Sequence, residues 1–237
     1  MQRVTEILKH ARANGETAPM TEGDLPATEG AAYAAATACV EDVAGWKIGG
    51  ANPWSREVFG NTQVFFGALD RRETYLDGDS VPTAGLVAPL AEPEIMLRLS
   101  GDADRPFDAM ALGIEIPATV LSDVLKPVLR AQMTDRAGAG LLWVGPVMAF
   151  DEGALLSAFD TAFHHNDAPV IAGRSANIIG GPLGAAAEFL ALARQHVMPL
   201  AAGQWVATGG LNPAVRVAAG DTVRFAALGH EVGLKFT

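Results

Sequence analysis

Several residue types that mark common protein classes are scarce in this sequence of 237 residues. The single cysteine, Cys39, excludes a disulfide within the chain and a thiolate cluster around a metal. We interpret Cys39 as a small buried hydrophobic residue. Lysine and arginine total 17 against 27 aspartates and glutamates, which gives a net charge of −10. This charge argues against nucleic acids and anionic membranes as partners, and it leaves carboxylates available to bind a hard cation.

Long hydrophobic runs are also absent, although 49% of the residues are hydrophobic. No stretch approaches the ~18 consecutive apolar residues that a membrane-spanning helix needs. The N-terminal stretch MQRVTEILKHARANGE has apolar residues on one helical face, but it lacks the continuous apolar core of a signal peptide. We therefore predict a cytoplasmic protein. The length suits one large domain, or one domain with a small appendage.

Motifs for several familiar chemistries are missing. The five histidines show neither H-x-x-x-H nor H-E-x-x-H spacing, so a zinc site is not predicted. There is no G-x-S-x-G nucleophile elbow. The segment NIIGGPLGAA resembles a phosphate-binding loop only weakly, because it lacks the G-x-x-x-x-G-K-[ST] pattern.

The hydrophobic pattern that is present changes character near Gly45. Residues 1–45 have helical periodicity, with one helix ending near Asn14-Gly15 and a second starting near Thr28. Beyond Gly45, short apolar runs separated by glycine and proline indicate strands and turns. One clear helix interrupts them, in the segment GGPLGAAAEFLALARQHVMPL.

The order of these elements predicts the fold class. Strands and helices do not alternate, which disfavours a doubly wound sheet or a barrel of alternating strands and helices. The segment AAGD near the C-terminus predicts a hairpin turn between strands that carry Arg216 and Arg224. We predict an α+β fold with a small helical N-terminal region over residues 1–45 and a mixed, rolled β-sheet core over residues 46–237.

Two glutamates stand two residues apart in the segment AEPEIMLRL. Residues i and i+2 of a strand point to the same face, so Glu92 and Glu94 project together and repel each other. Such pairs are usually solvated, but here an apolar run follows directly. Glu115, a lone acid in the apolar run ALGIEIPA, is the best candidate for a third ligand of a metal ion. Three carboxylates with open positions for water suit Mg²⁺ or Mn²⁺.

Two further segments carry candidate substrate-binding residues. Lys47 in GWKIGG either extends its ammonium group to the surface or faces a carboxylate or oxyanion of a substrate held at the metal. In VATGGLNP, Thr208 and the free backbone N–H groups of Gly209 and Gly210 form either an anion-binding turn or a plain connection between strands. The residues alone leave both pairs of alternatives open.

Taken in order, these segments resemble the fumarylacetoacetate hydrolase superfamily. The resemblance is closest to its hydratase/decarboxylase branch, which contains 2-keto-4-pentenoate hydratases and 4-oxalocrotonate decarboxylases. The matching segments cover most of the chain and are AAYAAA, GWKIGG, FFGAL, AEPEIMLRL, ALGIEI, GLLWVGP, GRSANIIGGPLGAAAEFLA and LAAGQWVATGGLNPAVRVAAGDTVRF.

The resemblance implies a core of the fumarylacetoacetate hydrolase C-terminal-like type and homodimers or larger assemblies. It implies a metal held by Glu92, Glu94 and Glu115, which chelates the carboxylate and 2-oxo group of a 2-keto acid and stabilises an enolate. It also implies that Lys47 and the turn at Thr208-Gly209 lie beside the substrate.

The chain departs from the family pattern where proton transfer is expected. The acid that often follows the F-G-x-L motif aligns with Arg72, and Asp70 or Glu73 nearby could replace it as the acid/base. The family's Asp-Asn pair reads Asp135-Arg136. We predict a metal-dependent hydratase acting on a small 2-keto or 2-hydroxydienoic acid in aromatic-compound catabolism, with Lys47 orienting the substrate. The alternatives are a 2-keto acid decarboxylase, an acylpyruvate hydrolase, a non-catalytic protein that binds metal and 2-keto acid, and a purely structural domain.

Overall fold

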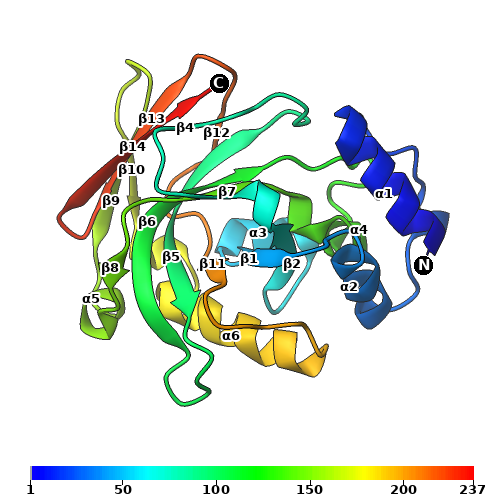
Figure 1. The fold of residues 1–237 in the computed structure, drawn as a ribbon, viewed down its shortest axis with the longest axis horizontal. Coiled ribbons are helices and arrows are strands. Elements are labelled where there is room, and N and C mark those ends of the chain that lie inside the picture. The colour runs from blue at the N-terminus through cyan, green and yellow to red at the C-terminus, as the bar shows by residue number, and fades with distance from the viewer. Residues whose placement is uncertain (1) are drawn as a thin grey trace.

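Two helices form the N-terminal part of the computed structural model, which describes residues 2–237. Helix α1 spans Gln2–Asn14 and helix α2 spans Glu29–Thr37, as predicted. The side chain of Thr28 caps α2 by accepting a hydrogen bond from the Ala31 N–H at 3.2 Å. The buried face of α1 shares a hydrophobic cluster with α2 and with residues 120–131, and the two helices lie together at one end of the molecule (Figure 1).

The larger of two sheets lies at the centre of the molecule. In order across the sheet, its strands are β2 (Phe65–Asp70), β1 (Val43–Gly49), β11 (Trp205–Ala207), β5 (Leu90–Leu99), β6 (Phe107–Pro117), β7 (Ala139–Val144) and β3 (Thr74–Leu76). Two short strands extend it, β12 (Val215–Arg216) beside β5 and β8 (Met148–Ala149) beside β6. The pairs β1–β11 and β3–β7 are parallel and the others antiparallel, so the sheet is mixed.

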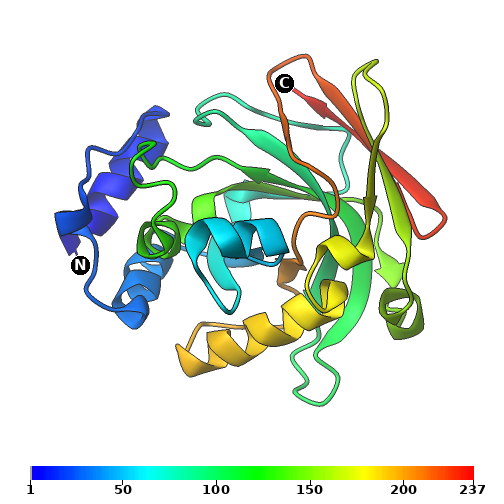
Figure 2. The same cartoon turned by 180° about the vertical axis from the view of Figure 1, so that it is seen from behind.

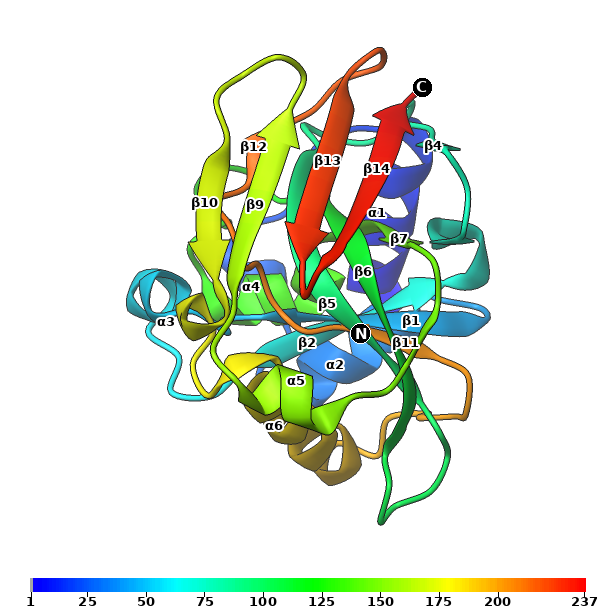
Figure 3. The ribbon, with the colours of Figure 1, turned by 90° about the vertical axis from the view of Figure 1, so that its left-hand side faces the viewer.

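The second sheet lies in front of β5 and β6 in Figure 3. Its strands, in order, are β10 (Ile171–Arg174), β9 (Asp160–His165), β13 (Thr222–Ala227), β14 (His230–Phe236) and β4 (Ser80–Val81). The prediction of a hairpin at AAGD is wrong, because β12 pairs with β5 in the first sheet whereas β13 pairs with β9 and β14 in the second. The segment therefore crosses between the sheets.

The remaining helices are α3 (Pro53–Phe59), α4 (Leu129–Thr134), α5 (Glu152–Leu156) and α6 (Gly181–Gln195). Figure 2 shows α6 running along the lower side of the molecule, below α3. The stretch Ser175–Gln195 is long and apolar enough to cross a membrane by length and composition, with a mean hydropathy of 1.3. Because Phe189 on α6 is fully buried within the main hydrophobic cluster, we interpret α6 as a core helix.

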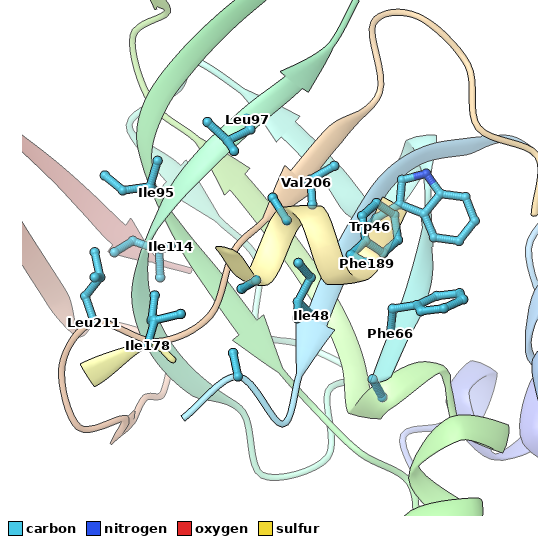
Figure 4. Close-up of a cluster of buried hydrophobic side chains, with 14 of the residues drawn as sticks. Trp46, Ile48, Phe66, Ile95, Leu97, Ile114, Ile178, Phe189, Val206 and Leu211 are labelled. Atoms are coloured by element: carbon cyan, nitrogen blue, oxygen red, sulfur yellow. The ribbon is translucent and has the colours of Figure 1, made fainter. Parts of the chain in front are cut away.

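Aromatic side chains join α6 to the sheet (Figure 4). The ring of Phe189 lies 5.7 Å from that of Trp46 on β1 and 5.3 Å from that of Phe66 on β2, between ring centroids. The indole N–H of Trp46 donates to Gln204 Oε1 at 2.8 Å, so this buried polar atom is satisfied. This packing fixes the position of Trp46 on β1. Lys47 is the next residue along the same strand.

The predicted α+β class, with a helical N-terminal region and a mixed sheet, is confirmed. The first strand begins at Val43, shortly before the predicted boundary at residue 46.

Candidate metal centre and substrate cleft

Three glutamates meet on one face of the β5–β6 pair. The antiparallel register places Glu92 directly opposite Glu115 and Glu94 opposite Gly113. Directly opposed residues share a face of the sheet, and so do residues i and i+2, so all three carboxylates project to the same side. One oxygen of each carboxylate lies within 4.8 Å of the others. The structure therefore brings together the three residues that the sequence suggested as metal ligands.

Burial makes this cluster costly without a cation. Glu94 and Glu115 are fully buried and Glu92 is half-buried. Burial raises the pKa of Glu115 to about 8, with Lys47 opposing and Glu92 adding to the shift. Burial, together with repulsion from Glu115 and Glu92, raises the pKa of Glu94 well above its usual range, and burial also raises the pKa of Glu92.

Three carboxylate oxygens in the cluster, Glu94 Oε1 and both oxygens of Glu115, have no hydrogen-bond partner among the described residues, although Glu115 Oε2 lies within ion-pair distance of Lys47. A buried carboxylate oxygen is rarely left unpaired unless it binds a metal or is protonated. The donor set is all oxygen, which is what Mg²⁺ and Mn²⁺ prefer. The residues present therefore fit a divalent cation of this kind.

Lys47 on β1 is the cationic neighbour of the cluster. Its side chain is buried, its Nζ lies 3.1 Å from Glu115 Oε2, and it donates a hydrogen bond to the carbonyl oxygen of Ala137 at 2.8 Å. Burial alone would lower the pKa of Lys47, but the three carboxylates outweigh it and raise the pKa. Three ionised carboxylates and one ammonium leave two negative charges, which a divalent cation would balance. Of the two alternatives for Lys47, the structure shows the inward one.

The turn after β11 lines the smaller cavity and also contacts the glutamate cluster. The hydroxyl of Thr208 donates to the carbonyl oxygen of Ile95 at 2.9 Å, and the N–H of Gly209 donates to Glu94 Oε2 at 2.6 Å. The expectation that the Gly209 N–H is free is therefore wrong, since it already binds a carboxylate of the cluster. Gly209 has a φ of +111°, and a Cβ there would lie 2.7 Å from the Cβ of Ala51, so the position requires glycine.

Asp70 and Glu73 lie in other hydrogen-bond networks. Asp70 accepts hydrogen bonds from the backbone N–H groups of residues 41–42 and from Arg72. Partial burial would raise its pKa, but these bonds lower the pKa to about 2. Glu73 accepts two hydrogen bonds from the buried guanidinium of Arg136, at 2.6 and 2.9 Å. Neither Asp70 nor Glu73 belongs to the cluster of three glutamates.

Two adjoining cavities, of about 420 and 640 Å³, reach the glutamate cluster. Both are lined by Asn52, Trp54, Glu92 and Gly210. Their size suits a small organic molecule. Neither Asp70 nor Glu73 is among the described residues that line them.

The two cavities differ in charge. The smaller one contains Lys47 and extends to Gln132 and Lys126, whereas the larger one extends to Asn177 and Asn212. Among the described residues that line either cavity, the ionisable side chains are those of Glu92, Lys47 and Lys126. No histidine is among these lining residues.

Comparisons with known proteins find similar proteins whose activities are named. No family model matches the sequence. A 2-keto-4-pentenoate hydratase of Burkholderia vietnamiensis is 32% identical over 194 residues, which cover 77% of this chain and 73% of that protein. A 2-hydroxyhexa-2,4-dienoate hydratase of Comamonas testosteroni is 28% identical over 239 residues, which cover 93% and 89% of the two chains.

A solved structure shares the fold. The 4-oxalocrotonate decarboxylase of Pseudomonas putida G7, in complex with magnesium and adipate, matches with a TM-score of 0.87. The match covers 99% of this chain and 96% of that chain, at 21% sequence identity. The topology of two packed sheets with a helical N-terminus is therefore that of the decarboxylase.

Proposed function

The chain belongs to the 2-keto-4-pentenoate hydratase family, in the hydratase/decarboxylase branch of the fumarylacetoacetate hydrolase superfamily, and we propose that it is a metal-dependent hydratase. Its substrate would be a small 2-hydroxydienoic acid, or the 2-keto acid in equilibrium with it, formed in aromatic-compound catabolism. The observation that carries the proposal is the cluster of three glutamates, with unpaired buried oxygens, beside a cavity that also contains Lys47. The activities of two relatives and the magnesium complex of the decarboxylase support it.

Glu92, Glu94 and Glu115 would hold Mg²⁺ or Mn²⁺. A bound ion would supply Lewis-acid chemistry, by withdrawing electrons from the substrate oxygens and stabilising the negative charge that develops on them. Gly209 contributes by fixing the Glu94 carboxylate through its N–H, which leaves the other oxygen of Glu94 for the ion.

Lys47 would bind the substrate from the side of the smaller cavity. An ammonium group has three N–H donors; one is donated to Ala137 O, and Nζ lies within ion-pair distance of Glu115 Oε2. A remaining N–H can donate to a substrate oxygen and stabilise the negative charge that develops there. Because this donor is held in place before the substrate arrives, little reorganisation is needed during the reaction.

Proton transfer would fall to a group that reaches the cleft. Glu92 and Lys47 are the ionisable side chains that line the cavities close to the cluster. Asp70 and Glu73 do not serve as acid/base in this proposal, because each is held by other partners. Water would reach the far end of the diene through the larger cavity, whose lining beyond Glu92 is uncharged.

Decarboxylation of a 2-keto dicarboxylic acid is the second candidate function. Lys126, which lines the smaller cavity, favours it because its ammonium group, now paired with Asp123 at 2.7 Å, could pair with a second carboxylate of the substrate. Hydrolysis of an acylpyruvate is less favoured, since no histidine is among the described lining residues to activate a water.

Thermal unfolding of metal-stripped protein tests the proposal. The unfolding temperature is measured with Mg²⁺, with oxalate and with both. Oxalate is a planar dianion that imitates the enolate of a 2-keto acid. A ligand at 100 times its dissociation constant adds about 2.7 kcal/mol of stability, and we expect the joint shift to exceed the sum of the separate shifts. Turnover of 2-hydroxypenta-2,4-dienoate and of 4-oxalocrotonate then separates the two candidate functions.

The matched variants are Glu94→Gln, which removes a ligand charge, and Glu16→Gln, which alters an exposed glutamate outside the site. We expect the first to lose the Mg²⁺-dependent shift and the second to keep it. A Mg²⁺ shift that survives in Glu94→Gln, or wild-type protein that turns over neither acid, would overturn the proposal.

The proposal also covers the wider organisation of the protein. We infer a rolled core divided from the helical region near residue 46, a homodimer or larger homo-oligomer, and a cytoplasmic location. Light scattering after size exclusion tests the assembly, because a single chain has a mass of 24.7 kDa.

A further inference from the structure

A short turn beside the cluster has an unusual backbone. Arg136, Ala137 and Gly138 have φ values of +56°, +55° and +71° in succession. This left-handed conformation is strained for a residue other than glycine. Two such residues in a row persist only where their surroundings hold them. The turn lies between α4 and β7.

Arg136 itself supplies one of the restraints on the turn. Its guanidinium is 2% exposed, pairs with both carboxylate oxygens of Glu73 and donates to the carbonyl oxygen of Ala68 at 3.2 Å. A planar guanidinium matches a carboxylate with two parallel bonds, which fixes orientation as well as distance. Glu73 follows β2 directly in the chain, so the pair attaches the turn to the edge of the sheet.

A second buried pair holds the residues on either side of the turn. Arg12 on α1 donates to the side chain of Asp135 at 2.6 Å, to its backbone carbonyl at 3.0 Å, and to the carbonyl oxygen of Ala139. Asp135 also accepts a hydrogen bond from the Thr119 hydroxyl at 2.6 Å. The three residues of the turn are thus held between two partly buried arginine–carboxylate pairs.

The turn lies against the strand that neighbours Lys47. On β2, Gly67 is the register partner of Lys47, and a Cβ at Gly67 would lie only 1.8 Å from the carbonyl oxygen of Arg136. The turn therefore occupies the space that a side chain at position 67 would need. From there the next carbonyl, that of Ala137, accepts the hydrogen bond from Lys47 Nζ at 2.8 Å.

We propose that Arg136 and Glu73 are positioning residues for Lys47: their ion pair holds the turn in its left-handed form, so that the Ala137 carbonyl keeps the Lys47 ammonium beside Glu115. Neither residue is among the described residues that line the two cavities. The inference rests on the proposed function in one respect, namely that Lys47 acts on a ligand bound at the cluster.

A double-mutant cycle distinguishes positioning from plain structural support. Arg136→Met, Lys47→Met and the double variant are compared by calorimetric affinity for oxalate with Mg²⁺ and by kcat. We expect Arg136→Met to lower both at least ~10-fold when Lys47 is present, since small misplacements of a reacting group cost up to ~100-fold. In the Lys47→Met background, Arg136→Met should change them less than ~2-fold. Equal losses in both backgrounds would overturn the inference.

Conservative variants guard against loss of folding. Arg136→Lys keeps the charge but not the two parallel bonds, and Glu73→Gln keeps the shape of the partner but not its charge. Both should give intermediate losses that again vanish in the Lys47→Met background. Arg98→Met, which breaks a partly exposed pair with Asp108, is the control and should leave oxalate affinity unchanged.

A crystal structure of Glu73→Gln tests the inference independently of activity. If wild-type protein fails to bind oxalate with Mg²⁺, the proposed function fails and this structure alone decides. A turn that has left the positive φ region, with Lys47 Nζ released from the Ala137 carbonyl, supports the inference. An unchanged turn with the bond still at 2.8 Å overturns it.

Discussion

Raising the pH should destabilise the metal-free protein, because burial favours the protonated form of Glu115. The pKa of Glu115 is raised from the usual 4.5 to about 8, chiefly by burial. A folded-state pKa above the unfolded one means that the folded protein keeps a proton that the unfolded chain releases. The resulting stability is fully present below pH 4.5 and is lost as the pH rises through about 8.

The size of the loss follows from the same linkage. One retained proton corresponds to about 1.4 kcal/mol per pH unit, and retention falls to one half at a pH equal to the folded-state pKa. Between pH 6 and pH 8 the free energy of unfolding should therefore fall by roughly 2 kcal/mol. For a chain of this size, that lowers Tm by roughly 4–8 °C.

The assay is urea or thermal unfolding in EDTA at pH 6, 7 and 8, repeated with Glu115→Gln. The amide cannot ionise, so the variant should show a flatter dependence on pH, and the dependence that remains comes from Glu94 and Glu92, whose pKa values are also raised by burial. Saturating Mg²⁺ should reverse the trend in the wild type, because the cation binds the deprotonated carboxylates. Parallel curves for wild type and Glu115→Gln in EDTA would refute the reasoning.

The remaining predictions concern backbone contacts around the site. Gly67→Ala should lower the free energy of unfolding by about 3 kcal/mol, since its methyl group would collide with the carbonyl oxygen of Arg136. Gly78→Ala, with no atom near its Cβ, is the control in the same denaturant assay. Gly209→Ala should weaken Mg²⁺ binding roughly 10-fold or more by calorimetry, because a strained turn would withdraw the N–H that orients Glu94. Unchanged Mg²⁺ affinity in a folded Gly209→Ala protein would show that this hydrogen bond does not prepare the site.

The elements with strong local signals were predictable. The cap at Thr28 and the helix-ending Asn14-Gly15 pair act within a few residues, so both N-terminal helices were found from the sequence. The turn chemistry of AAGD is equally local, but it does not specify which sheet the following strand joins. That choice depends on the pairing of β13 with β9 and β14, which lies outside the window of the motif.

The candidate site divides in the same way. The spacing of Glu92 and Glu94 fixes a shared face once the segment is a strand, and the apolar surroundings of Glu115 mark an acid that must be compensated. The sequence does not set the register that places Glu92 opposite Glu115, because register depends on the pairing of whole strands. Nor does it show that Arg136 engages Glu73, a residue 63 positions away in the chain.

The sequence by itself determined the fold class and the three acids, from periodicity and from charges beside or within apolar runs, and it left the orientation of Lys47 open. Only the tertiary structure decided how they act together. It carries Lys47 on β1 and the acids on β5 and β6, with β11 between them. It also assigns the Gly209 N–H to Glu94 and the Ala137 carbonyl to Lys47. These are contacts between segments far apart in the chain, and they form only when the sheet assembles and excludes water from the charges it encloses.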